Sequence, residues 1–188
     1  MKRYVLTGAP GAGKTSVLDA LRERGFPVVA EAATDVISQQ QARGVAKPWQ
    51  RDDFVDRIVA LQRDRLGAAT ARGPDPGDPP GAPEVHDRSV LCTLALARFL
   101  GRPVTPPLAA EVARVVAAGV YERTVFLLRP LGFIVPTPAR QISYRDSLDF
   151  ERLHEAAYRE QGFELIGVAA ASVAERAALI ADEIAARS

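Results

Sequence analysis

The chain has 188 residues, of which 47% are hydrophobic and 25% are charged, and its formal net charge is +1. This length predicts a single domain of ordinary globular composition. A charge so near zero excludes a general attraction to nucleic acid or to an anionic membrane surface. No apolar run is long enough to span a bilayer, the N-terminus enters a strand without a signal peptide, and the single cysteine, Cys92, excludes an internal disulfide. We therefore expect a cytoplasmic protein with no nucleic-acid or membrane partner.

A glycine-rich stretch near the N-terminus lies between residues 3–7, predicted as a short strand, and residues 16–22, predicted as an amphipathic helix. The stretch satisfies the phosphate-binding pattern G-x-x-x-x-G-K-[ST] at every fixed position. Its glycines let the backbone curl so that several N–H groups point inward, and the following helix adds its positive N-terminal end. The predicted cofactor-binding residues are Gly8, Ala9, Pro10, Gly11, Ala12, Gly13, Lys14, Thr15 and Ser16.

Two side chains of this motif are suited to nucleotide chemistry. Lys14 can reach the β- and γ-phosphates of a nucleotide, and the Thr15 hydroxyl is placed to ligate Mg²⁺. The alternative is a glycine-rich turn without a ligand, which we set aside because the full motif occurs between a strand and a helix. We interpret the motif as a binding site for ATP with Mg²⁺, and GTP fits the motif equally well.

The rest of the chain alternates between strand and helix patterns. Strands are predicted over residues 26–31, 84–88, 124–128 and 163–168, and helices over 34–41, from 48 to about 66, 91–99, 107–118, 148–161 and 173–186. The Pro- and Gly-rich residues 72–83 are predicted as a mobile surface loop, and the Pro- and Arg-rich residues from 129 to about 147 as a lid. Five strands alternating with helices predict an α/β fold with a parallel sheet, here a P-loop NTPase domain over residues 1–188.

Acidic and basic side chains are expected at the edge of the sheet where open parallel sheets bind ligands. Asp87 and Arg88 end the third predicted strand. The carboxylate can hold Mg²⁺ through water or accept a proton from an attacking hydroxyl, and the guanidinium can bind a phosphate or the substrate. Glu31 ends the second strand and is a candidate general base or hydroxyl anchor. The alternative for Glu31 is a carboxylate that the dipole of the following helix favours.

Together these segments resemble one family, the small AAA-domain P-loop ATPases that include the kinase domain of bacterial nicotinamide riboside kinases. The resemblance extends more distantly to deoxynucleoside and thymidylate kinases. It is carried by the phosphate-binding motif and by residues 28–33, 87–89, 94–101 and 172–176. It implies a kinase-type sheet of order 2-3-1-4-5, with Asp87 as the acidic strand-end residue and Arg88 as a phosphate clamp. Members often carry an aspartate and a tyrosine in the next helix, where this chain has Cys92 and Leu96, so their nucleoside contacts are not carried over.

The resemblance also implies a lid with arginines that close on the transferring phosphoryl group. Arg145 best matches the lid arginine of the family, and Arg140 is the second candidate. A cation that arrives on closure stabilises negative charge in the transition state and excludes water. The alternative is that these are solvated surface arginines, some of them paired with nearby acids at helical spacing.

Four further side chains receive a structural interpretation. Trp49 is interpreted as a partly buried anchor, with a base-stacking platform as the alternative. His86 and His154 lack any metal-ligand spacing, and Cys92 lies among apolar neighbours on a predicted helix, so we assign all three to the core.

The predicted function is phosphoryl transfer from a nucleoside triphosphate to a hydroxyl group of a small molecule, catalysed mainly by positioning and charge neutralisation. The acceptor can be a nucleoside, a cofactor precursor or a natural product. The alternative is a nucleotide-dependent regulator that hydrolyses slowly and binds a protein or lipid partner. A G-protein switch is disfavoured because the chain contains no N-K-x-D element.

Overall fold

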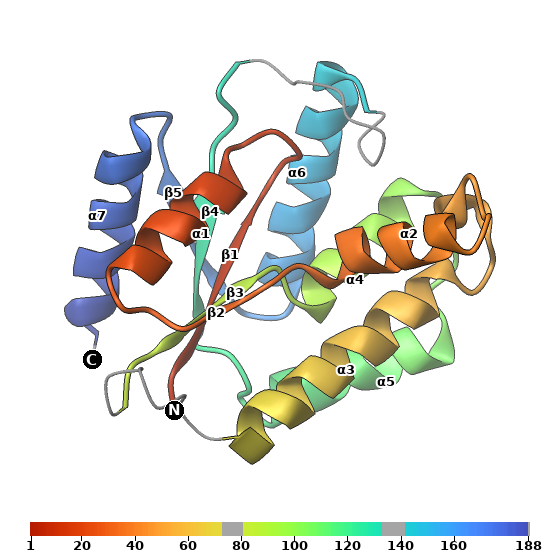
Figure 1. Cartoon of the computed structure of the whole chain (residues 1–188), viewed down its shortest axis with the longest axis horizontal. Coiled ribbons are helices and arrows are strands. Elements are labelled where there is room, and N and C mark those ends of the chain that lie inside the picture. The colour runs from red at the N-terminus through yellow and green to blue at the C-terminus, as the bar shows by residue number, and fades with distance from the viewer. Residues whose placement is uncertain (73–80, 133–141, 188) are drawn as a thin grey trace.

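The computed structural model of the protein describes residues 1–72, 81–132 and 142–187. Five strands form one parallel sheet in the order β2-β3-β1-β4-β5, which confirms the predicted order (Figure 1). The strands are β1 (Arg3–Gly8), β2 (Val28–Val29), β3 (Glu84–Asp87), β4 (Thr124–Leu128) and β5 (Glu164–Val168).

Helices cover both faces of the sheet, so the chain forms three layers (Figure 1). One face is covered by α1 (Lys14–Glu23) and α7 (Val173–Ala185). The other is covered by α4 (Val90–Phe99), α5 (Pro106–Ala117) and α6 (Tyr144–Glu160), with α3 (Phe54–Arg72) packed outside them. The remaining helices, α2 (Ala32–Ala42) and the short 3₁₀ helix η1 (Pro48–Gln50), lie beside α3. In the described residues no helix is both long enough and apolar enough to cross a bilayer.

The central strand β1 divides the core into two parts. Tyr4 and Leu6 pack with α1 and α7, whereas Val5, which points to the opposite face, packs with α4 and α6. All three side chains are fully buried. Strands buried on both faces are expected in a parallel sheet that has helices on each side.

Several element boundaries differ from the prediction. The helix predicted from residue 48 to about 66 is instead the 3₁₀ helix η1 followed by α3, which begins at Phe54 and ends at Arg72. Two further differences have reasons visible in the backbone. β2 is shorter than residues 26–31, because the Phe26 N–H bonds back to the carbonyl of Leu21 and so belongs to the turn that ends α1. α6 begins at Tyr144, four residues before the predicted start at residue 148. The Ser143 hydroxyl caps this earlier start by accepting a hydrogen bond from the Asp146 N–H at 3.1 Å.

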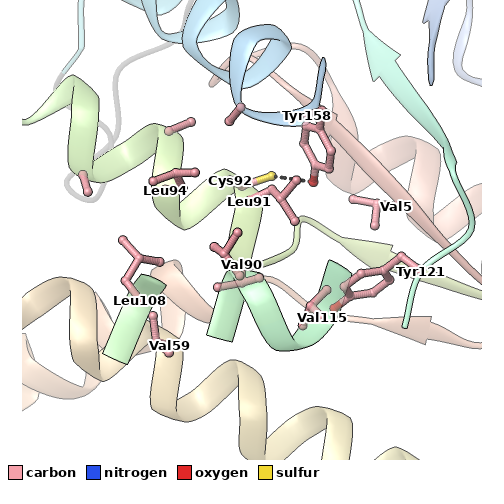
Figure 2. Packing of buried hydrophobic residues seen from close by; sticks show 14 of the residues in the cluster. Val5, Val59, Val90, Leu91, Cys92, Leu94, Leu108, Val115, Tyr121 and Tyr158 are labelled. Carbon is pink, nitrogen blue, oxygen red and sulfur yellow. Dashed lines mark hydrogen bonds between the residues drawn. The ribbon is translucent and has the colours of Figure 1, made fainter. Parts of the chain in front are cut away.

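A buried polar contact ties α6 to the start of α4. The Tyr158 hydroxyl lies 3.2 Å from the Cys92 Sγ (Figure 2). It also lies 2.7 Å from the Ser89 Oγ. The Ser89 Oγ also caps α4 by accepting from the Leu91 N–H. Cys92 is buried in the core, as expected, and the contact fixes α6 against the segment that follows β3.

We expect the substitution Tyr158→Phe to lower the free energy of unfolding by about 1 kcal/mol, because the buried Ser89 and Cys92 side chains lose a hydrogen-bond partner. Urea denaturation monitored by circular dichroism measures the change. Tyr144→Phe is the matched control on the same helix, because Tyr144 is 38% exposed. Equal stability of the two variants would contradict the role of this hydroxyl.

Candidate functional site

The glycine-rich motif forms a loop from β1 to α1, as the sequence predicts. The backbone φ values of Gly8, Gly11 and Gly13 are 143°, 85° and 81°. Residues other than glycine rarely adopt such values. At Gly8 the need for glycine is also steric, since a Cβ there would lie 2.5 Å from the Leu128 carbonyl oxygen. The loop is therefore pressed against the end of β4, and its curl depends on that close approach.

Lys14 begins α1 and folds back over this loop. Its Nζ lies 3.4 Å from the carbonyl oxygens of both Gly8 and Ala9, and its side chain is buried. Burial and, to a smaller extent, the nearby Arg88 guanidinium lower the pKa of Lys14 to about 8, although Asp87 and Glu31 oppose the shift. Without a ligand the ammonium group is thus held among carbonyls and close to another cation, an environment that an anionic ligand would improve.

Asp87 ends β3 beside this loop, and its carboxylate is suited to ligate Mg²⁺. Its Oδ1 is buried and has no hydrogen-bond partner in the described residues. Burial raises the pKa of Asp87, and Glu31 adds to the shift, while Lys14 opposes it. The residues that would hold Mg²⁺ are Asp87 and Thr15, which lies exposed on the first turn of α1. Within the described ranges no three His, Cys, Asp or Glu side chains gather as a metal site, and Mg²⁺ usually takes its other ligands from phosphates and water.

Arg88 connects three elements at the centre of the site. Its Nε lies 2.7 Å from the Glu31 Oε1, its Nη2 donates to the Gly8 carbonyl at 3.1 Å, and its guanidinium lies 5.8 Å from the Phe150 ring centroid. Its φ of 71° is the only positive value among the described residues other than glycine. Such strain persists only where the surrounding contacts determine the conformation, and here the side chain is held on several sides.

Glu31 lies at the start of α2, where the structure shows its position and partners but does not test its predicted role. It is the N-cap residue of α2, so it lies at the positive end of a helix dipole, but its side chain makes no capping hydrogen bond to the backbone. The carboxylate instead accepts a hydrogen bond from the Thr34 hydroxyl at 2.9 Å and pairs with Arg88. Its side chain is 25% exposed, so the carboxylate remains accessible to a ligand.

His154 on α6 contacts the site residue Arg88, which the sequence did not predict. Its Nδ1 lies 2.8 Å from the Phe150 carbonyl oxygen, which can only accept, so Nδ1 carries the proton. Its Nε2 therefore accepts from the Arg88 Nη1, which lies at 2.6 Å. Burial, together with the charge of Arg88, holds the pKa of His154 well below its usual value. The imidazole is buried, as expected, but it is a neutral acceptor for a site residue, which no spacing in the sequence indicates.

A cavity of about 360 Å³ opens beside Lys14. The Glu31 carboxylate and the Arg88 guanidinium lie at its polar end. Most of its wall is apolar and comes from α2, η1, α3, α4 and α6. The aromatic lining residues are Trp49, Phe54, Phe99 and Phe150. Trp49 is half-buried and also packs against the cluster formed by α2 and α3, so it is an anchor that faces the cavity.

The structure does not bring the first of the two predicted lid arginines into this site. Arg145 is exposed on the first turn of α6, is not among the residues that line the cavity, and forms no ion pair within the described residues. Arg140 lies outside the described residues, as do residues 73–80 of the predicted loop and residues 133–141 of the predicted lid. Arg129, at the start of that lid, pairs instead with Glu151 and Glu155 on α6.

The sequence matches the AAA-domain family over residues 3–176, which is most of the chain and includes the whole site. The chain belongs to this family of AAA domains. Its phosphate-binding loop and sheet order are accordingly those of a nucleotide-binding P-loop fold. No curated protein sequence matches the chain significantly.

Solved structures of kinases share this fold. The NadR protein in complex with NAD and AMP-PNP is 15% identical with a TM-score of 0.69, over 97% of this chain and 48% of the NadR chain. This chain therefore spans about half of NadR. Deoxyadenosine kinase from M. mycoides is 12% identical with a TM-score of 0.56, over 99% of this chain and 100% of the kinase. Thymidylate kinase from Ehrlichia chaffeensis is 12% identical with a TM-score of 0.60, over 97% and 98% of the respective chains. At such low identities the likeness establishes the fold.

We expect the affinity for an ATP analogue with Mg²⁺ to fall by about tenfold per pH unit above pH 8. Phosphates bind the charged lysine, so above the pKa of about 8 the complex holds a proton that the free protein lacks, and raising the pH weakens binding. Isothermal titration calorimetry between pH 7 and 10 measures the effect. The variant Lys14→Arg remains charged over this range and should give a flatter profile. An equally steep loss in both proteins would contradict this assignment.

Proposed function

We propose that this protein is a Mg²⁺-dependent kinase that transfers the γ-phosphoryl group of ATP to a hydroxyl group of a small molecule. The observation that carries the proposal is the cavity that begins at Lys14 and has the Glu31–Arg88 pair at its polar end. A nucleotide on the P-loop would place its terminal phosphate near Lys14, so a molecule in the cavity would have its hydroxyl next to the reacting group.

Each site residue then has a defined task. The P-loop amides and Lys14 would neutralise charge on the β- and γ-phosphates, and Mg²⁺ held by Thr15 and Asp87 would neutralise the remainder. Glu31 would accept the proton of the attacking hydroxyl, because it lines the cavity whereas Asp87 does not. Arg88 would bind the transferring phosphoryl group and hold the Glu31 carboxylate in place.

The cavity supports an acceptor with an apolar or aromatic body, either nucleoside-like or a natural product. Aromatic walls provide stacking surfaces for a planar ring system. The kinases that share this fold act on nucleosides or nucleotides by name, which favours a nucleoside-like acceptor. A regulator that only binds and hydrolyses a nucleotide has no need of such a cavity, so the geometry favours the kinase over the regulator.

We expect Lys14→Ala to lower phosphoryl transfer by about 10²- to 10³-fold, equivalent to about 3–4 kcal/mol of transition-state stabilisation, with folding intact. The assay follows ADP release from ATP in the presence of a panel of hydroxylated acceptors, with product detection by mass spectrometry. Lys47→Ala is the matched control, because Lys47 is exposed and outside the site. Retained turnover in the Lys14 variant would overturn its role. Hydrolysis that no acceptor stimulates would favour the regulator instead.

We expect Glu31→Gln to lower kcat by about 10²- to 10⁴-fold while the affinity for ATP changes little, because the amide cannot accept the hydroxyl proton. Single-turnover transfer with an acceptor from the panel separates this effect from nucleotide binding. Glu164→Gln is the control, since Glu164 is exposed at the start of β5. An unchanged kcat would remove Glu31 from the mechanism and would leave Asp87 as the candidate base.

A further inference from the structure

Arg176 lies in the first turn of α7, behind the P-loop. It is the last residue of the segment 172–176 that contributed to the family resemblance, and only 2% of its surface is exposed. Its Nη1 donates to the Ala12 carbonyl at 2.7 Å, and its Nη2 donates to the Arg129 carbonyl at 3.1 Å. A single guanidinium therefore joins α7 to the P-loop and to the residue that follows β4.

No carboxylate neutralises this buried cation within the described part of the chain. None of the ion pairs found there includes Arg176, and its Nε is buried without a hydrogen-bond partner. Burial alone lowers the pKa of Arg176, and no neighbouring charge contributes. By contrast, Arg88 has Glu31, and Arg129 has two glutamates. A buried charge without an opposite charge destabilises a protein, so its position needs another explanation.

The planarity of the peptide group supplies that explanation. In a trans peptide the carbonyl oxygen and the following N–H point in opposite directions, so holding the Ala12 oxygen toward α7 turns the Gly13 N–H away from α7. An N–H that points away from α7 can donate to phosphate oxygens that bind on the concave side of the loop. The contact is close, because a Cβ added to Gly13 would lie 3.2 Å from the Arg176 Nη1.

We propose that Arg176 is a positioning residue of the phosphate site, which orients the Ala12–Gly13 peptide and whose charge is balanced when a nucleotide's phosphates bind. Phosphate groups on the other side of this single peptide supply the negative charge that the described residues do not place beside Arg176. The proposal depends on the proposed function only in that phosphates bind the P-loop, and it requires no particular acceptor.

The test is the substitution Arg176→Met, which keeps much of the side-chain volume and removes the charge. Calorimetric titration with Mg-pyrophosphate and with MgATP should show about 10- to 100-fold weaker binding of both ligands, the loss expected for a charged hydrogen bond. Without ligand, the denaturant midpoint should be unchanged or higher than that of the wild type. Arg123→Met is the matched control, because Arg123 is exposed and donates to the Gln161 carbonyl at the opposite end of β4.

Wild-type affinity of Arg176→Met for both ligands would overturn the inference, and so would a lower midpoint with unchanged affinity, which is the result of a merely structural role. If this variant does not fold, the variants Arg176→Lys and Arg176→Gln test the proposal instead. Each keeps a hydrogen-bond donor, but only the lysine variant keeps the positive charge. The lysine variant should bind pyrophosphate at least fivefold more tightly than the glutamine variant, and equal affinities would refute the proposal. If the wild type binds neither ligand, the proposed function fails as well.

Discussion

The arrangement of the site depends on where the Arg88 guanidinium is held. The residue adopts a left-handed backbone conformation at the end of β3, and its side chain contacts the P-loop through Gly8, α2 through Glu31 and α6 through His154. Because one of these partners is a neutral imidazole, Glu31 supplies the carboxylate that pairs with the guanidinium. The same contacts that fix the geometry of the cavity thus hold an ion pair at its polar end.

Two buried arginines lie on opposite sides of the P-loop and differ in their surroundings. Arg88 is paired with a carboxylate that a ligand can also reach, whereas the partners of Arg176 among the described residues are backbone carbonyls. With Lys14 between them, the free protein concentrates positive charge around one loop, and this charge favours polyanionic ligands over neutral ones. Concentrating positive charge in this way lowers the stability of the folded protein. Binding sites commonly combine function with such a loss of stability.

The sequence predicted the parts of this structure that depend on local patterns. The P-loop, the parallel sheet and its order followed from glycine spacing, strand–helix alternation and the family resemblance, and the positions of Lys14 and Glu31 followed with them. The contact between His154 and Arg88 could not be predicted, because it joins residues 66 positions apart through the packing of α6 on α4. The same holds for the cavity, whose walls come from several different elements, and for the role of Arg176, whose partners are distant carbonyls.

The half-buried indole of Trp49 has a practical consequence, since it is the only tryptophan in the chain and it faces the cavity. Its intrinsic fluorescence reports on that single location without labelling, and the emission of an indole depends on the polarity around its ring. A compound that displaces solvent from the cavity should therefore change the spectrum whether or not it is phosphorylated. Libraries of unmodified metabolites can be screened optically in this way before any reaction product is known.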